Sequence, residues 1–211
     1  ARIIDKIDFS ALESGAKWIV GFSDITVLHN ALSRVGVASI HGIMAKHITL
    51  KADGLENLMS MLFGCEVNYE ISAHELNKIG EASGELVGGN LSVLYGLRGT
   101  PFDIDYSGKI LFIEDLSERL YHIDRMMQNL RLGGVFEKIS GLVVGQFTDI
   151  DEDNSFAGGA YGVIAEAVKD YNIPVCFNFP AGHVENNQPL KMGAKYYLEV
   201  QKNKTILKCL D

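Results

Sequence analysis

The stretch of residues 17–41 constrains the fold more than any other part of this sequence. Its first residues, 17–21, form a short apolar run with β-branched members, which is typical of a buried strand. The apolar residues that follow, from Ile25 to Leu32, recur at a helical spacing, and a second apolar run at 37–41 comes next. A strand, a helix and a strand joined by short turns predict an α/β fold with a parallel sheet.

The rest of the chain continues this mixture of helices and strands. We expect helices at 53–63, 91–97, 118–132 and 158–171, strands at 66–71, 79–87, 109–113, 140–147, 174–177, 192–200 and 205–210, and a turn at 88–90. The pattern changes character between residues 47 and 70, which predicts a domain boundary. We therefore expect three segments: the end of an α/β domain at 1–50, a connecting segment with the first strands of the next domain at 51–87, and a second domain at 88–211. Because residues 1–7 resemble the end of a helix, we expect residues 1–50 to be the last part of a larger domain.

Composition and charge exclude several classes of function. A net charge of −8 without a basic stripe argues against nucleic-acid binding, and no apolar run reaches the length of a membrane span. The first residues lack the apolar core of a signal peptide, and the three cysteines are far apart, so we expect a cytoplasmic protein with reduced thiols. No residues have the spacing of a zinc site, and no Gly-x-Gly-x-x-Gly or Walker loop is present. We expect neither a metal nor a cofactor.

Ser23 stands between the first strand and the first long helix. A serine at such a turn is held exposed at the carboxyl edge of the sheet, where it can act as a nucleophile. The backbone N–H of Asp24 can then stabilise an oxyanion at the start of the helix. The alternative is that Ser23 or Asp24 only caps the helix, a role in which both residue types are common.

A serine nucleophile needs a base, and His183 is the best-placed histidine. It lies in a loop after the strand at 174–177, at the strand edge where α/β proteins build their sites. Five other histidines lie in segments that we expect to be core or surface: His29, His41, His47, His74 and His122.

The base needs an orienting acid, and two carboxylates follow the buried strand at 109–113. We expect Asp115 to help cap the helix that begins near Glu118, and Glu114 to be the functional acid. The chain order Ser23, Glu114, His183 also occurs in α/β-hydrolases, although the turn here is Gly-x-Ser-Asp and not Gly-x-Ser-x-Gly.

Several motifs then resemble the LD-carboxypeptidase family of serine peptidases, in order over essentially the whole chain. They are Gly21-Phe22-Ser23-Asp24-Ile25-Thr26, His41-Gly42, Gly88-Gly89-Asn90-Leu91, Phe112-Ile113-Glu114-Asp115, Tyr121-His122-Ile123-Asp124-Arg125 and Gly182-His183. The resemblance implies a catalytic triad of Ser23, Glu114 and His183. It also implies the end of a flavodoxin-like parallel-sheet domain joined to a C-terminal β/β/α domain of the swivelling type, in a cytoplasmic homodimer without metal. Family members carry further βα units and a Gly-Gly-Tyr-Gly-type loop upstream, which supplies the second oxyanion donor, and we expect this chain to begin just after that loop.

The function implied is hydrolysis of the bond between an L-centre and a terminal D-amino acid in a murein tetrapeptide. One alternative is the microcin C immunity branch, which cleaves peptidyl-nucleotides; others are a non-catalytic binding module and a flavin or nucleotide binder. Trp18, expected in the core, and an acidic loop at 147–156 both favour the murein branch. Four cations are candidates to bind the substrate carboxylate, each of which can also be structural: Arg98, Arg119, Arg125 and Lys191.

Overall fold

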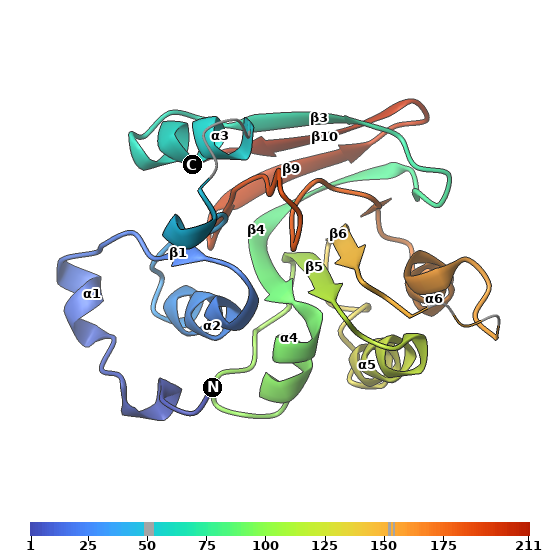
Figure 1. Cartoon of the computed structure of the whole chain (residues 1–211), viewed down its shortest axis with the longest axis horizontal. Coiled ribbons are helices and arrows are strands. Elements are labelled where there is room, and N and C mark those ends of the chain that lie inside the picture. The colour runs from blue at the N-terminus through green and yellow to red at the C-terminus, as the bar shows by residue number, and fades with distance from the viewer. Residues whose placement is uncertain (49–52, 152, 154) are drawn as a thin grey trace.

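The computed structural model describes residues 1–48, 53–151, 153 and 155–211, and within them the chain forms two sheets with helices around them (Figure 1). The α-helices are α1 (Ser10–Ser14), α2 (Thr26–Arg34), α3 (Asp53–Leu62), α4 (Leu91–Leu97), α5 (Leu120–Leu132) and α6 (Gly159–Val168). Short 3-10 helices span Ile4–Lys6, Ser23–Ile25 and Ala45–His47. The strands are β1 (Val20–Gly21), β2 (Ser39–His41), β3 (Asn68–Ser72), β4 (Gly80–Asn90), β5 (Ile110–Leu116), β6 (Gly141–Thr148), β7 (Val175–Cys176), β8 (Leu190–Met192), β9 (Lys195–Val200) and β10 (Lys204–Cys209).

The smaller sheet combines two strands from the N-terminal part of the chain with one from its C-terminal part. Its strand order is β1-β2-β8: β1 and β2 are parallel, with Val20 opposite Ile40, and β8 pairs antiparallel with β2. The predicted strand–helix–strand unit is therefore confirmed, with α2 as its crossover helix. The third strand comes from the C-terminal part of the chain, which ties that part to the segment carrying Ser23.

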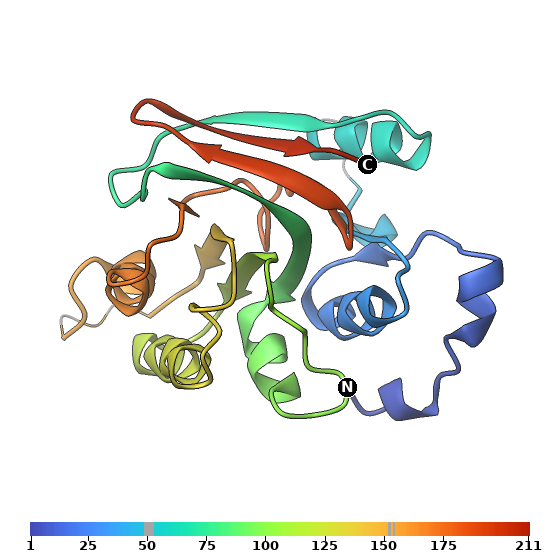
Figure 2. The same ribbon diagram turned by 180° about the vertical axis from the view of Figure 1, so that it is seen from behind.

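The larger sheet, in the order β3-β10-β9-β4-β5-β6-β7, has an antiparallel half and a parallel half. The long strand β4 joins them, because residues 80–85 pair antiparallel with β9 and residues 86–90 pair parallel with β5. Figures 1 and 2 show β4 curving from one half into the other, with α4, α5 and α6 below the parallel half. Mixed α/β structure with a parallel sheet confirms the predicted fold class.

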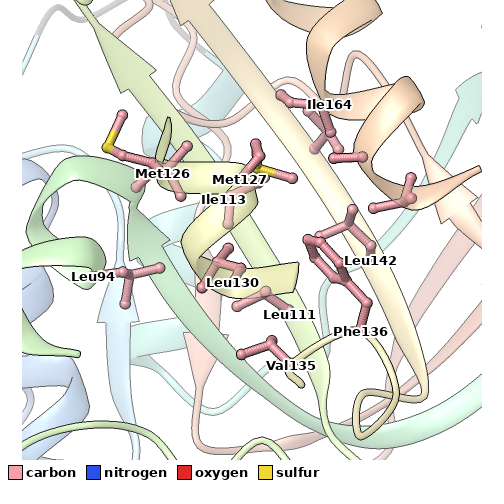
Figure 3. Close-up of a cluster of buried hydrophobic side chains, with 14 of the residues drawn as sticks. Leu94, Leu111, Ile113, Met126, Met127, Leu130, Val135, Phe136, Leu142 and Ile164 are labelled. Carbon is pink, nitrogen blue, oxygen red and sulfur yellow. The ribbon is translucent and has the colours of Figure 1, made fainter. Parts of the chain in front are cut away.

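The parallel strands are buried on both faces, as their continuous apolar sequences require. In β5, Leu111 and Ile113 pack with α5 and α6 in the cluster of Figure 3, whereas Ile110 and Phe112 face the opposite cluster. The same alternation sends Glu114 to the face of Phe112 and Asp115 to the face of Ile113. Two adjacent carboxylates thus enter different environments.

Three expected elements differ in the structure. The predicted strand at 17–21 pairs only at Val20–Gly21, and Trp18 is 43% exposed where we expected it in the core. Residues 88–90 are the end of β4 and not a turn, because they continue the ladder with β5. Residues 192–200 are not one strand: Gly193, at a φ of +83°, lets the chain turn so that β8 and β9 enter different sheets.

The remaining differences are small. Helix α1 lacks a clear apolar period and was not expected, and the helix end expected at 1–7 is only a short 3-10 turn at Ile4–Lys6. Cys65 is exposed, whereas Cys176 and Cys209 are buried, and all three are free. None of the helices in the described ranges is both long and apolar enough to traverse a bilayer.

Candidate active site

Ser23 lies directly beyond β1, at the start of the short 3-10 helix that runs into α2. Its backbone has a φ of +61°, a left-handed conformation that a residue with a side chain adopts only at a cost of about 1–2 kcal/mol. The predicted position at a strand-to-helix turn is confirmed. The capping alternative is wrong, because the N-cap positions belong to Phe22 for the 3-10 helix and Ile25 for α2, and not to Ser23 or Asp24.

The turn around Ser23 is held by close packing. A Cβ on Gly21 would lie 2.7 Å from Ile25 Cγ1, so a larger residue there would push the turn open. The carbonyl of Gly21 also bonds the buried His29, whose Nε2 lies 2.9 Å away, while its Nδ1 lies 2.8 Å from Ser39 Oγ. His29 is thus a structural core residue, as expected.

The predicted acid and base are in contact. His183 Nδ1 and Glu114 Oε2 are 2.7 Å apart, although the two residues are 69 positions apart in the sequence. The His183 ring packs edge-on against Phe22, with 4.7 Å between ring centroids, and Phe22 precedes Ser23. The fold therefore brings Glu114 and His183 into contact and packs His183 against the residue that precedes Ser23. No hydrogen bond joins Ser23 to His183 among the described residues, and such bonds are often long before substrate binds.

Glu114 is fully buried, yet it is ionised. Burial alone would raise the pKa of its carboxyl, but the hydrogen bond from His183 and the nearby His41 outweigh burial and lower it. The ionised carboxylate of Glu114 accepts a hydrogen bond from the Nδ1–H group of His183. That tautomer leaves Nε2 of His183 as the free basic nitrogen.

His41, which was named in the His41-Gly42 motif but expected to be a core or surface histidine, lies beside Glu114. It ends β2, is fully buried, and its Nε2 lies 3.9 Å from Glu114 Oε1. The other histidines lie elsewhere: His47 ends a 3-10 helix, His74 packs on Tyr161, and His122 bonds Glu118.

Asp115 caps a helix, but a different one from the helix we expected. Its Oδ2 accepts a bond from the N–H of Ser92, in the first turn of α4, and its Oδ1 accepts one from the Asn90 amide, both at 2.8 Å. Helix α5 begins at Leu120 without a side-chain cap. The expected helix start near Glu118 was therefore two residues too early. Burial raises the pKa of Asp115 to about 6.

A cavity of about 510 Å³ adjoins His183 and Phe22. Its walls are mostly apolar, with Ile43, Ile48 and Val184, and its charged members are Lys46 and Glu185. No motif or pattern in the sequence distinguishes Lys46. The four cations that we expected as carboxylate ligands are not among the residues lining this cavity.

Three of those four cations have protein partners of their own, and the fourth lies over an aromatic ring. Arg98 pairs with Asp103 at 2.9 Å, Arg119 lies 3.7 Å from Asp151, Arg125 lies over the ring of Tyr121, and Lys191 Nζ donates to the carbonyl of Asp211. Asp151 and Asp153 of the acidic loop line a separate cavity of about 630 Å³, whereas Glu152 lies outside the described residues. In the part of the chain that the structure describes, no three His, Cys, Asp or Glu side chains gather as a metal site.

Comparison with known proteins identifies the class. The model of the LD-carboxypeptidase C-terminal domain matches residues 83–198, and that of the LD-carboxypeptidase N-terminal domain matches residues 1–42. The chain belongs to the LD-carboxypeptidase family.

The relatives of this chain include proteins with two kinds of name, murein carboxypeptidases and a microcin self-immunity protein. A probable murein peptide carboxypeptidase of Bacillus subtilis is 36% identical over 213 residues, which cover 92% of this chain and 63% of the relative. The crystal structure of the muramoyltetrapeptide carboxypeptidase of Oxalobacter formigenes is 30% identical, with a TM-score of 0.91 over 100% of this chain and 74% of that one. The microcin C7 self-immunity protein MccF of Escherichia coli is 26% identical over 234 residues, covering 95% of this chain and 67% of the relative. The chain thus spans somewhat less than two thirds of the Bacillus relative's length.

Proposed function

We propose that this chain carries the catalytic residues of a serine carboxypeptidase, with Ser23 as nucleophile, His183 as base and Glu114 as the orienting acid. The observation that supports it most is the pair of buried Glu114 and half-buried His183, packed against the residue that precedes a left-handed serine. Helix caps, core histidines and surface acids account for each residue separately, but not for the packing of the Glu114–His183 pair against the turn that carries Ser23.

In the proposed reaction, His183 Nε2 takes the proton of the Ser23 hydroxyl while Ser23 Oγ attacks the scissile carbonyl. The N–H of Asp24 donates to the oxyanion of the tetrahedral intermediate, and His183 then protonates the departing amine. Water, deprotonated by His183, hydrolyses the acyl-enzyme and regenerates Ser23. Glu114 stays ionised throughout and stabilises the imidazolium form of His183 through the 2.7 Å bond.

The substrate we propose is a short murein tetrapeptide, whose terminal D-alanine enters the cavity beside His183. Its apolar walls suit a methyl group, and Lys46 is the cation placed to bind the terminal carboxylate. The names of the Bacillus and Oxalobacter relatives support this substrate class. We also propose a cytoplasmic homodimer, with the domain division at 1–50, 51–87 and 88–211 described above.

The test is release of D-alanine from murein tetrapeptide by the full-length wild-type protein and by its Ser23→Ala variant. We expect release by the wild type only. Lys46→Ala should raise KM about tenfold, equivalent to about 1.4 kcal/mol, with little change in kcat. Lys191→Ala is the matched control, because its ammonium faces the carbonyl of Asp211. A folded wild type that releases no D-alanine would contradict the substrate assignment, and an unchanged KM in Lys46→Ala would contradict the role of Lys46.

The second candidate function, cleavage of a peptidyl-nucleotide, is favoured by the similarity to MccF. It uses the same three residues with a different leaving group. Hydrolysis of an aminoacyl-sulfamoyl adenosine, together with no release of D-alanine from murein tetrapeptide, would select this branch.

A further inference from the structure

We propose that His41 is a positioning residue that holds the second carboxylate oxygen of Glu114, which extends the proposed unit to Ser23, His183, Glu114 and His41. The inference deepens the proposed function and rests on it for its kinetic readout. A structural readout that needs no substrate tests it separately.

The first observation is a set of buried polar atoms that face one another. Among the described residues, neither ring nitrogen of His41 nor Oε1 of Glu114 has a hydrogen-bond partner. His41 Nε2 lies 3.9 Å from Glu114 Oε1, and both side chains have no exposed surface. A buried ionised oxygen without a partner is costly, and a shift of about 1 Å would close this gap to a hydrogen bond. His41 is thus placed to satisfy the oxygen that His183 leaves free.

The second observation is that the His41 ring is held in this orientation by its surroundings. It meets the ring of Phe112 edge-on at 4.9 Å and that of Phe22 at 6.2 Å, measured between centroids. Phe112 precedes Glu114 by two residues on the same face of β5, and Phe22 precedes Ser23. The ring therefore packs between the two segments that carry the acid and the nucleophile.

A single donated hydrogen bond is enough for this role. His41 faces Glu114 on β5 and, on α2, His29 at 6.2 Å between ring centroids. With its proton on Nε2, the ring donates to Glu114 Oε1 and carries no N–H on Nδ1, so no buried N–H is orphaned.

His41 also links the two sheets. It belongs to β2 of the smaller sheet, whereas Glu114 belongs to β5 of the larger one. A bond between them fixes the rotation of the Glu114 carboxylate relative to the segment that carries Ser23. Loss of that bond should leave substrate binding intact and disturb the proton-transfer geometry, which predicts a fall in kcat without a matching change in KM.

The experiment compares His41→Gln, His41→Phe and, as a matched control, His74→Gln, which replaces a histidine packed on Tyr161 away from this site. Glutamine can still donate a hydrogen bond to Glu114, whereas phenylalanine fills the space without a donor. We expect kcat for D-alanine release to fall about tenfold to a hundredfold in His41→Phe, the range typical of residues that orient a site's ligands, and to recover in part in His41→Gln. KM should stay within about twofold in both variants.

The substrate-independent readout is the far-downfield proton resonance of the 2.7 Å His183–Glu114 bond, observed by NMR. We expect it at the wild-type position in His74→Gln, near it in His41→Gln, and shifted or lost in His41→Phe. If the resonance follows this order while no variant releases D-alanine, the positioning role holds and the substrate assignment fails. A folded His41→Phe that keeps both the resonance and kcat would overturn the proposed role of His41. If His41→Phe does not fold, an unchanged resonance and an unchanged kcat in His41→Ala would overturn it in the same way.

Discussion

Gly182 lies beside Glu114 and His183, and its replacement by alanine should displace the Glu114 carboxylate by an amount that the reaction rate can report. Its φ is +132°, a region that L side chains rarely adopt, and a Cβ there would lie 3.0 Å from Glu114 Oε2 and 3.1 Å from Glu114 Cβ. Ordinary contacts begin near 3.4 Å, so the Glu114 carboxylate must move by about 0.4 Å. Because a 1 Å misplacement can cost about a hundredfold in rate, this shift predicts a loss in kcat of about fivefold to tenfold.

The backbone strain has its own cost, which a matched control separates. Gly80 has a φ of +154°, and a Cβ on it would meet only Pro174, at 3.4 Å. Both alanine variants should lose about 2 kcal/mol of folding free energy, or roughly 4–8 °C in Tm. Thermal unfolding and D-alanine release measure the two effects. Equal kcat in Gly182→Ala and Gly80→Ala at matched loss of stability would refute the argument that Gly182 keeps space for Glu114.

Three further predictions follow from the site. Ser23→Gly and Ser23→Ala should both lose hydrolytic activity. In chemical denaturation the glycine variant should be more stable than the alanine variant by about 1 kcal/mol, because only glycine adopts the +61° φ without strain. Equal stabilities would argue against strain at this turn. Glu114→Gln should lower kcat about 10⁴-fold in steady-state assays, because the amide cannot stabilise the His183 imidazolium; a loss below tenfold would remove Glu114 from the unit. Burial raises the pKa of Asp115 from its ordinary 3.8 to about 6, so between these pH values the folded state binds a proton that the unfolded state does not. The free energy of unfolding therefore falls as pH rises through this window. Asp115→Asn should flatten this pH dependence in unfolding titrations from pH 4 to pH 6, and an unchanged slope would contradict the argument.

The parts of the site that depend on local pattern could be predicted from the sequence. A buried strand followed by a helical period places Ser23 at a turn, and a buried strand followed by two acids places Glu114 at a strand end. The prediction for Asp115 named the right role but the wrong helix, because its partner, the N–H of Ser92, lies on a helix 23 residues earlier in the chain. That contact depends on how β4 and β5 pair, which local pattern does not show.

The residues that the sequence missed depend on how distant elements pack. His41 lies in a short apolar run and reads as a core residue, and only the packing of β2 against β5 brings it 3.9 Å from Glu114. Residues 192–200 have a continuous β-strand composition, yet the turn at Gly193 divides them. Strand β8 before the turn pairs with β2 of the smaller sheet, and β9 after it pairs with β4 of the larger sheet. Their predicted places at strand ends first grouped Ser23, Glu114 and His183, and the motifs that resemble the LD-carboxypeptidase family supported that grouping. Neither periodicity nor spacing alone could pair residues 69 positions apart.

The central claim is that Ser23 is a nucleophile activated by the His183–Glu114 pair. The most direct measurement is the rate at which a fluorophosphonate probe labels the protein, with the modified residue located by mass spectrometry. The account predicts labelling at Ser23 in the wild type, much slower labelling in His183→Ala and Glu114→Gln, and no faster labelling in the double variant than in either single one, because the two residues act as a unit. Labelling of Ser23 at the same rate in the wild type and in His183→Ala, or no labelling of a folded wild type, would contradict it.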